Sequence, residues 1–443
     1  MTSCGLFLLP AIAATSVASE SSDSLTRLQR DMLAAYQAGQ YDRVVRSLEN
    51  TPPGQEPSPK MLRVGLRSYV RMGKPEAAFR TYTRLVPPGS ADETSLLREL
   101  AVAFVVERVR DPQEYLRIAS YTALAEIANR ELGPLLTDGL LDTSIIVRAR
   151  AVEGLGRLET TNSLRTLRQA LGDPAPTVRI AALNALGKRG DTQALPPIRR
   201  IARAEEGPTR VFALGALVQL GDDRALIDLT RAATLPQVDT RMAALGVLGR
   251  LRHPTSLSVI SQSIYDPVPS VRAFAAGALG EFGSPNGAAA LTFALEDQDP
   301  RVRSVAAASL GRLGLQRNKT LLWQAARDPM PIVRTGAVEG LLRLGDGTVV
   351  LVAADLAKHQ DPSVRGGVAQ AIGLAQSPKG LQVLEQLLQD QQPQPRVTAA
   401  RSLGHITDQR VIRLLKGALA DSEPSVRITA GGSLAKVLAS TQG

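Results

Sequence analysis

Cysteine and histidine are both scarce in this 443-residue chain, which has one cysteine, Cys4, and three histidines. A single cysteine cannot form an intrachain disulfide, and it excludes cysteine-rich metal sites. The histidines, His253, His359 and His405, are far apart in the sequence, and none is paired with a glutamate at a metal-binding spacing. Because no zinc-ligand pattern is present either, we predict no bound metal and no other cofactor.

Aromatic residues make up only 3% of the chain, and Trp323 is the one tryptophan. Such isolated aromatic side chains cannot form the stacking platforms that single-stranded nucleic acids require. Alanine, leucine and glycine are abundant instead. Small side chains allow helix backbones to approach closely, so this composition favours stacked short helices.

Catalytic motifs are missing as well. The chain has no G-x-x-x-x-G-K-[ST] loop, no G-x-S-x-G elbow and no G-x-G-x-x-G after a predicted strand. Paired carboxylates such as Glu205-Glu206 and Asp222-Asp223 fall in predicted turns, where acidic residues usually cap helices or contact water. We therefore predict no catalytic residues and no enzymatic activity.

Long apolar runs are absent beyond the N-terminus, so the body of the chain predicts no transmembrane helix. Residues Gly5 to Ala18 are mostly apolar, and both Ala11-Ile-Ala13 and Ser16-Val-Ala18 resemble signal-peptidase sites. The usual preceding basic residues are missing, since the first is Arg27. We predict that residues 1–24 are a signal peptide and that the protein is exported to the bacterial periplasm or envelope. The alternative is a disordered tail on a cytoplasmic protein.

Acidic residues are outnumbered by basic ones, 42 against 52, which gives a formal net charge of +10. Arginine supplies 44 of the basic residues and lysine only eight. This balance favours an acidic partner, such as nucleic acid, an anionic membrane or an acidic protein face. The alternative is that arginine is simply the preferred basic residue of the organism and that many arginines occupy a fixed position of a sequence repeat.

One sequence motif recurs through most of the chain. Its clearest copy runs from Asp266 to Gly280 as DPVPSVRAFAAGALG. Its arginine, here called the marker arginine, recurs at intervals of 31 residues, at positions 117, 148, 179, 210, 241, 272, 303, 334, 365, 396 and 427. A fixed period of this length is typical of a solenoid, in which one small unit stacks on copies of itself.

Each unit has the pattern of a helix pair when positions are counted from the marker arginine. Asp is found at −6 in eight units, Pro at −3 in seven, Ala at +3 in nine, Leu at +7 in ten and Gly at +8 in seven. Pro suits the first turn of a helix, and the Asp ahead of it can accept hydrogen bonds from the free N–H groups of that turn. We expect the glycine to permit the turn into a second helix.

Marker arginines and the aspartates at −6 together predict a ladder of charge-assisted hydrogen bonds between successive units. The residues assigned to this ladder are Arg148, Arg179, Arg272, Arg303, Arg334 and Arg427, with Asp142, Asp173, Asp266, Asp297, Asp328 and Asp421. The units of Arg210 and Arg241 lack the aspartate. That departure indicates either local curvature, a partner site, or sequence drift.

The pattern resembles HEAT repeats, in particular the short repeats of phycobilin lyase subunits. D-P-x-P-x-V-R-x-x-A-x-x-x-L-G, as it stands from Asp173 and from Asp266, carries the resemblance across residues 111–443. The resemblance implies an all-α solenoid of stacked antiparallel helix pairs that serves as a binding scaffold. It implies no bilin chemistry here, because no residue that would carry it is evident. HEAT-like di-iron hydroxylases hold their metals with repeated His-Glu motifs, which this chain lacks.

A different repeat precedes these units. Gly39 and Gly73 lie 34 residues apart, as do Pro53 and Pro87. A period of 34 with a central glycine and a closing proline resembles tetratricopeptide repeats. We predict that residues 25–110 form a region of this kind, with two unrelated helical hairpins as the alternative.

Basic residues recur at +9, at the expected C-terminal end of the first helix of each pair. This set, here called the basic row, comprises Arg157, Lys188, Arg250, Arg312, Arg343 and Lys436. It predicts a basic track for an acidic partner. The alternative is that these side chains only offset the helix macrodipole.

Together these observations predict a non-catalytic scaffold that binds another protein, with an acidic face, along a solenoid shaped as a rod or arc of about 100 Å. The concave face is the expected binding surface. Nucleic acid is not the expected partner. The alternative function is a cytoplasmic binder of an acidic ligand, either nucleic acid or a chromophore-bearing protein, through the basic row.

Overall fold

The computed structural model describes residues 26–51 and 56–440. Within these ranges all regular secondary structure is helical, which confirms the predicted all-α solenoid. The chain divides into two compact units, one ending at Glu107 and one beginning at Arg108. The predicted signal peptide lies outside the described residues.

The N-terminal unit is built from short helices joined by tight turns. A helix over residues 26–37 is followed by α2 (Tyr41–Glu49), α3 (Pro59–Arg71), α4 (Pro75–Leu85) and α5 (Thr94–Val106). Gly39 and Gly73 have φ values of +72° and +67° in two of these turns, a conformation that glycine adopts without strain. The tetratricopeptide-like character of this unit stays a prediction.

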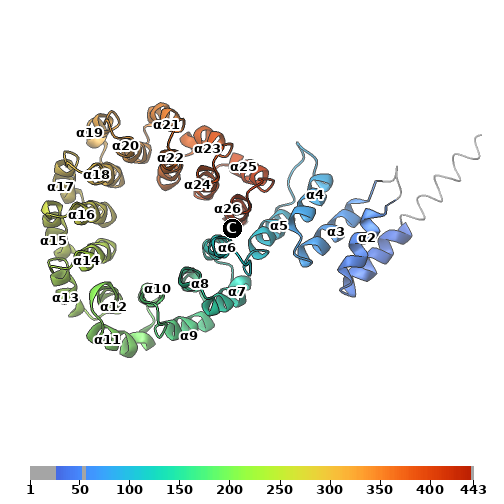
Figure 1. Cartoon of the computed structure of the whole chain (residues 1–443), viewed down its shortest axis with the longest axis horizontal. Helices are drawn as coiled ribbons and strands as arrows, with labels where there is room; N and C mark the ends of the chain where they lie inside the picture. Colours follow the sequence, from blue (N-terminus) through green and yellow to red (C-terminus); the bar gives the residue numbers. More distant parts are fainter. Residues whose placement is uncertain (1–25, 52–55, 441–443) are drawn as a thin grey trace, which may run out of the picture. The chain divides into compact units, whose positions relative to one another are not determined.

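The second unit consists of helix pairs in two layers (Figure 1). Each inner helix carries a marker arginine, and in described residues 114–440 these helices are α6 (Glu114–Ile127), α8 (Ile145–Arg157), α10 (Pro176–Lys188), α12 (Gly207–Gln219), α14 (Val238–Leu251), α16 (Pro269–Phe282), α18 (Pro300–Arg312), α20 (Pro331–Arg343), α22 (Pro362–Ala375), α24 (Pro393–Leu403) and α26 (Pro424–Ser440).

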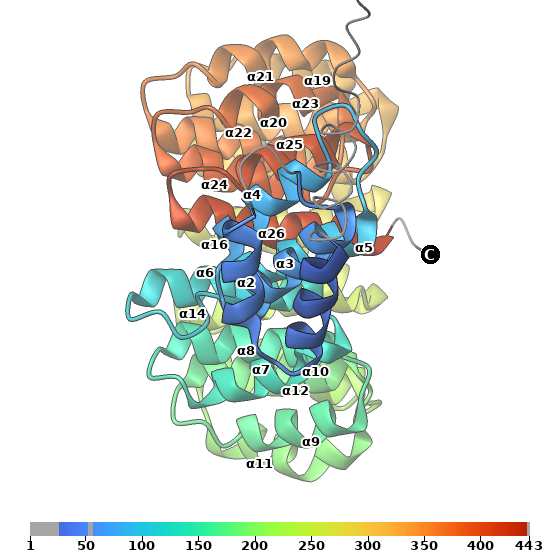
Figure 2. The same cartoon turned by 90° about the vertical axis from the view of Figure 1, so that its right-hand side faces the viewer.

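Between them lie the outer helices, which are α7 (Gly133–Asp138), α9 (Thr161–Ala170), α11 (Leu195–Ala204), α13 (Ala225–Ala232), α15 (Leu257–Gln262), α17 (Ala288–Ala294), α19 (Lys319–Ala325), α21 (Val350–Leu356), α23 (Leu381–Leu387) and α25 (Arg410–Ala418). Short 3-10 turns flank most of the outer helices. From the side, the helices run across the thickness of this unit (Figure 2).

The stack closes on itself, so the expected rod or open arc is wrong. The last inner helix, α26, packs along the first, α6, and completes a ring (Figure 1). Gly432 lies so close to α6 that a Cβ atom there would be 2.6 Å from the Cβ of Ala123. Closure follows from the curvature of the stack, because eleven junctions that each turn by about 33° complete a circle.

Glycines at +8 bring neighbouring inner helices together, and they do not form the turn expected of them. A Cβ on Gly249 would lie 2.8 Å from the backbone oxygen of Ala278, the residue at +6 in the next unit. The turn is made three residues later, where the backbone has positive φ at Gly190, Gly221, Gly283, Gly314 and Gly345. The pattern showed a small residue but not which surface required it.

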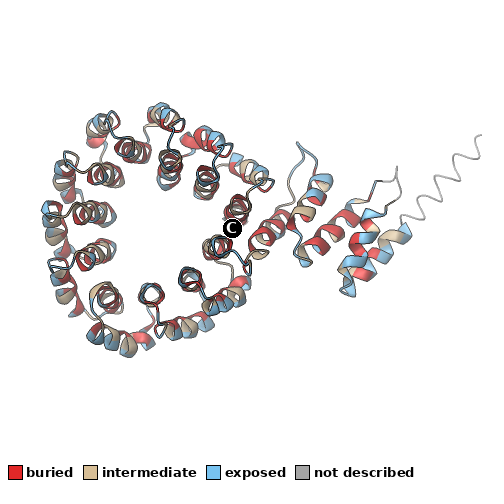
Figure 3. Cartoon of the chain, viewed as in Figure 1, coloured by how far each residue is buried: buried red, intermediate tan, exposed pale blue. Residues whose placement is uncertain are grey.

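The core is a continuous layer between the inner and outer helices (Figure 3). Leucines at +7, such as Leu248 and Leu279, are fully buried, as are Leu229 and Ile260 of the outer layer. Among the described residues, no helix combines the length and the apolar character needed to cross a bilayer.

Candidate binding surfaces of the ring

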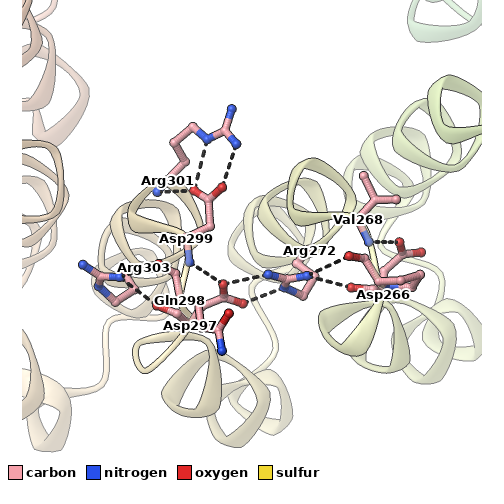
Figure 4. Close-up of polar contacts among 9 residues, drawn as sticks. Asp266, Val268, Arg272, Asp297, Gln298, Asp299, Arg301 and Arg303 are labelled. Atoms are coloured by element: carbon pink, nitrogen blue, oxygen red, sulfur yellow. Dashed lines mark hydrogen bonds and ion pairs between the residues drawn. The ribbon is translucent and has the colours of Figure 1, made fainter.

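The marker arginine joins two successive units through four hydrogen bonds (Figure 4). Arg272 donates from Nη1 to the carbonyl oxygens of Asp266 and Pro267, at 2.9 and 3.3 Å. It also donates from Nε and Nη2 to both carboxylate oxygens of Asp297 in the next unit, at 2.6 and 2.8 Å. One guanidinium therefore fixes its own loop and the loop of the neighbouring unit.

This arrangement recurs around the ring wherever the residue 25 positions after the marker arginine is an aspartate. The pairs are Arg117–Asp142, Arg148–Asp173, Arg241–Asp266, Arg272–Asp297, Arg303–Asp328, Arg365–Asp390 and Arg396–Asp421. In the last unit, Arg427 donates to the carbonyl oxygens of Asp421 and Ser422. Hydrogen bonds from Arg272 and Arg365 hold the pKa of Asp297 and of Asp390 below its usual value.

The aspartate at −6 caps its loop and not the helix, contrary to expectation. Asp266 Oδ1 accepts a hydrogen bond from the backbone N–H of Val268, which is the N-cap residue of α16. Helix α18 is capped instead by Asp299, whose side chain accepts from the Arg301 N–H. The −6 carboxylate is thus shared between a loop N–H and the arginine of the preceding unit.

The ladder changes where the repeat departs from its pattern. Arg179 reaches Glu205 at 2.9 Å, because position 204 is alanine. Arg210 and Arg334 have only distant acidic partners, Asp228 at 3.9 Å and Asp355 at 3.7 Å. Their usual partner positions hold Leu235 and His359. These two links of the ring are therefore electrostatically weaker.

The basic row lies at the opposite ends of the inner helices, and most of its members have partners within the protein. Arg157 donates to the carbonyl oxygen of Ala125, near the end of α6, at 2.9 Å. Arg312 and Arg343 both donate to Oε1 of the buried Glu339, at 3.1 and 3.0 Å. Such contacts satisfy helix C-terminal carbonyls and one buried acid.

The remaining three members of the basic row differ from one another. The Arg250 guanidinium lies over the ring of Phe212 at 5.7 Å. Burial lowers the pKa of Lys436, which is half-buried. Lys188 is exposed and makes no hydrogen bond or ion pair with any described residue. The row is therefore not a continuous track of free charges.

A separate surface, unrecognised in the sequence, faces the interior of the ring. Positions −2, +2, +5 and +9 share one side of each inner helix, since residues three and four apart are neighbours on a helix. The other sides pack against adjacent helices, so these lumen positions line the opening. Five of them hold large apolar side chains that are 43–51% exposed: Tyr115, Ile146, Phe274, Ile332 and Leu374.

The opening is narrow enough to restrict what can enter it. Eleven helix axes spaced at about 9 Å form a circle about 32 Å across. Subtracting one helix diameter of about 11 Å leaves a lumen of about 20 Å. A single helix or an extended chain fits this width, whereas a folded domain does not.

One hollow of about 410 Å³ indents the lumen wall across α18, α20 and α22. Its apolar lining includes Val305, Ile332 and Leu374, and Arg312 and Glu339 also line it. The hollow exists because positions +2 of two adjacent helices are glycines, Gly336 and Gly367. Aligning the units at +2 and +5 could have revealed these glycines, but only the packing of α18, α20 and α22 shows that these positions share one surface.

This architecture, a ring of stacked helix pairs tied by an Arg–Asp ladder, defines a closed α-solenoid. Residues 133–211, 258–342 and 318–397 match the family model described as HEAT repeats, and residues 395–421 match that of the PBS lyase HEAT-like repeat. The chain belongs to the HEAT-repeat proteins, which confirms the resemblance seen in the sequence. A comparison with curated proteins gave no match.

Solved structures show distant similarity. Human deoxyhypusine hydroxylase in complex with glycerol is 19% identical, with a TM-score of 0.29, over 57% of this chain and 96% of that chain. The complex of CpcE and CpcF of phycocyanin lyase from Nostoc sp. PCC7120 is 20% identical, with a TM-score of 0.34, over 60% of this chain and 96% of that chain. Nothing about the activity of this chain follows from these similarities.

Proposed function

We propose that this protein is a non-catalytic scaffold whose ring encircles a segment of a partner protein. The observation that carries the proposal is the exposure of five large apolar side chains on the lumen face. Ile332 and Leu374 line one hollow of the lumen wall, and apolar side chains exposed side by side mark an interaction site. The lumen width of about 20 Å limits the encircled part to a helix or an extended chain.

Two exposed phenylalanines provide a matched test of this proposal. Phe274 lies at a lumen position and is 48% exposed, whereas Phe293 lies on outer helix α17 and is 52% exposed. Each would be replaced in turn by a photoreactive phenylalanine analogue, and the purified protein would be irradiated in a lysate of the native organism. We expect a defined protein adduct from position 274, and none of the same mass from position 293.

Adducts of equal yield and identity from both positions would contradict encirclement. An adduct from position 274 that disappears after nuclease treatment would instead support the acidic-ligand alternative through the basic row. The proposal also includes export of the mature chain, for which N-terminal sequencing of the protein from native cells is the test. A blocked or intact Met1 terminus in the cytoplasmic fraction would contradict export.

A further inference from the structure

The lumen wall has two chemically different arcs. On α12, α14, α16, α18, α20 and α22, positions +2 and +5 hold Phe212, Gly215, Ala243, Gly246, Phe274, Gly277, Val305, Ala308, Gly336, Glu339, Gly367 and Gln370. On α24, α26, α6, α8 and α10 the same positions hold Arg401, Arg150, Glu153, Asn184, three threonines, Gly432 and two alanines. We call these the apolar arc and the polar arc; at −2 the polar arc also holds Tyr115 and Ile146.

Glycines in the apolar arc are of two kinds. Gly336 is required for packing, because a Cβ there would clash with the backbone of Ser304. By contrast, a Cβ on Gly277 would lie 3.6 Å from Val305 Cγ1, and one on Gly367 would lie 3.7 Å from Thr335 Cγ2. Those are ordinary contact distances, so the packing of the ring does not require glycine at 277 or 367.

A glycine inside a helix destabilises it by about 0.5–1 kcal/mol relative to alanine. Gly246, whose Cβ would meet only the end of the Arg250 side chain at 3.7 Å, is a third glycine without a packing reason. All three face the lumen between or beside the exposed Phe274, Ile332 and Leu374. Because these three residues have no side chain, the lumen wall is recessed there. The recess leaves room for apolar side chains of another molecule.

The polar arc carries the larger excess of positive charge, although the apolar arc also holds Arg250, Arg312 and Arg343 at +9. Its +2, +5 and +9 positions include the basic residues Arg150, Arg157, Lys188, Arg401 and Lys436 and the acidic residues Glu126 and Glu153. The two acids are matched by Arg401 at 3.6 Å and Arg150 at 2.7 Å. Three basic residues remain without an acidic side chain of their own in this arc.

We propose that the lumen holds an amphipathic helix whose polar face is acidic. This inference rests on the proposed function and specifies the chemistry of the encircled segment. The apolar face of such a helix would lie on the apolar arc and place a side chain in the hollow of α18, α20 and α22. Its acidic face would then look toward the polar arc, at a separation comparable with the Debye length of about 8 Å.

Model peptides test this chemistry without knowledge of the natural partner. The probe is a fluorescent, 21-residue amphipathic helix with leucines on one face and glutamates on the other. One control peptide has the same composition in scrambled order, and a second has lysine in place of glutamate. Using fluorescence anisotropy with the full chain, we expect each control to bind at least about ten-fold more weakly, or 1.4 kcal/mol.

Matched variants of the protein test whether the peptide binds in the lumen. Gly367→Glu puts a charge on the apolar arc. Gly417→Glu makes the same change on outer helix α25, where a Cβ would meet nothing within 4 Å. Lys188→Glu reverses a charge of the polar arc, and Lys358→Glu is its control at an exposed position after outer helix α21. We expect each lumen variant to weaken binding about ten-fold and each control to leave it unchanged.

Equal binding of the three peptides, or equal effects of lumen and outer variants, would overturn this inference. If adducts still form from position 274 in that case, encirclement stands and only the amphipathic, acidic character of the segment fails. If both experiments fail, the proposed function fails as well. Because glutamate is a better helix former than glycine, circular dichroism should show that Gly367→Glu leaves the fold intact.

Discussion

The marker arginine explains why one residue type recurs with so little drift. Its planar guanidinium donates to two carbonyl oxygens on one side and to a carboxylate on the other, as Arg272 shows. A lysine has a single ammonium group and cannot reproduce this geometry. The arginine-rich composition is therefore accounted for in part by the architecture, and the net charge alone does not identify a partner.

Removing a marker arginine should destabilise the ring only where the ladder is complete. We expect Arg272→Ala to cost about 2–3 kcal/mol, because it leaves Asp297 partly buried without its charged partner. Arg210→Ala should cost less than about 0.5 kcal/mol, since Arg210 is exposed and its acidic partner is 3.9 Å away. Hydrogen-exchange mass spectrometry of the adjacent helices measures both. Equal losses would contradict the assigned role of the ladder.

Ladder carboxylates should also make stability depend on pH. The folded-state pKa of Asp297 and of Asp390 is lowered, so their stabilisation is complete above the unfolded-state value of about 3.9. It is lost as the pH falls through the lower folded-state pKa. We expect a denaturation midpoint that is flat between about pH 5 and 7 and falls below about pH 4. In Asp297→Asn, the acid-induced fall should be smaller.

At the level of the helix, the sequence predicted which residues form each pair but not what each glycine does. Helix starts at Pro269, Pro300 and Pro331 agree with the expected first-turn prolines. The glycine at +8 was misassigned because a small residue is compatible with a turn and with a close helix contact alike. Only the positions of the neighbouring helices separate the two.

Alanine substitution should separate the two kinds of glycine with opposite signs. Gly249→Ala should destabilise the protein by about 1–3 kcal/mol, because its Cβ would meet the Ala278 backbone at 2.8 Å. Gly277→Ala should stabilise it by about 0.5–1 kcal/mol, since space is free and helix propensity improves. Urea denaturation midpoints of the two variants provide the comparison. Destabilisation by Gly277→Ala would contradict the free space assigned to the lumen wall.

At the scale of the whole molecule, the period predicted a solenoid but not a ring. Closure depends on a small rotation at every unit, and a sequence pattern does not encode that angle. The seam also differs from the regular junctions. Gly432, which meets Ala123, is at +5 and not at +8. This three-residue offset corresponds to about 4.5 Å along the helix. Because of it, the repeat pattern did not predict the contact between α26 and α6.

Only part of the candidate site could be predicted from the sequence. The basic row and the ladder could be listed from spacing alone, because both lie at fixed offsets from one arginine. The lumen surface could not, because Tyr115, Phe274 and Leu374 are far apart in the sequence and occupy different offsets. They face one enclosed lumen only because α26 meets α6.

The distance across the seam is the most direct test of this account. Spin labels would be placed at Glu126→Cys and Arg401→Cys, with Cys4→Ser, and their separation measured by pulsed electron paramagnetic resonance. Asn184→Cys with Arg250→Cys is the control, because it joins the same offsets, +5 and +9, of two regular units two apart.

The ring predicts a separation of at most about 20 Å, two helix spacings, for both pairs. In the ring, the Arg401 and Glu126 side chains lie 3.6 Å apart. A seam distance beyond about 60 Å, with the control unchanged, would show an open array and contradict both the closed lumen and the function proposed for it.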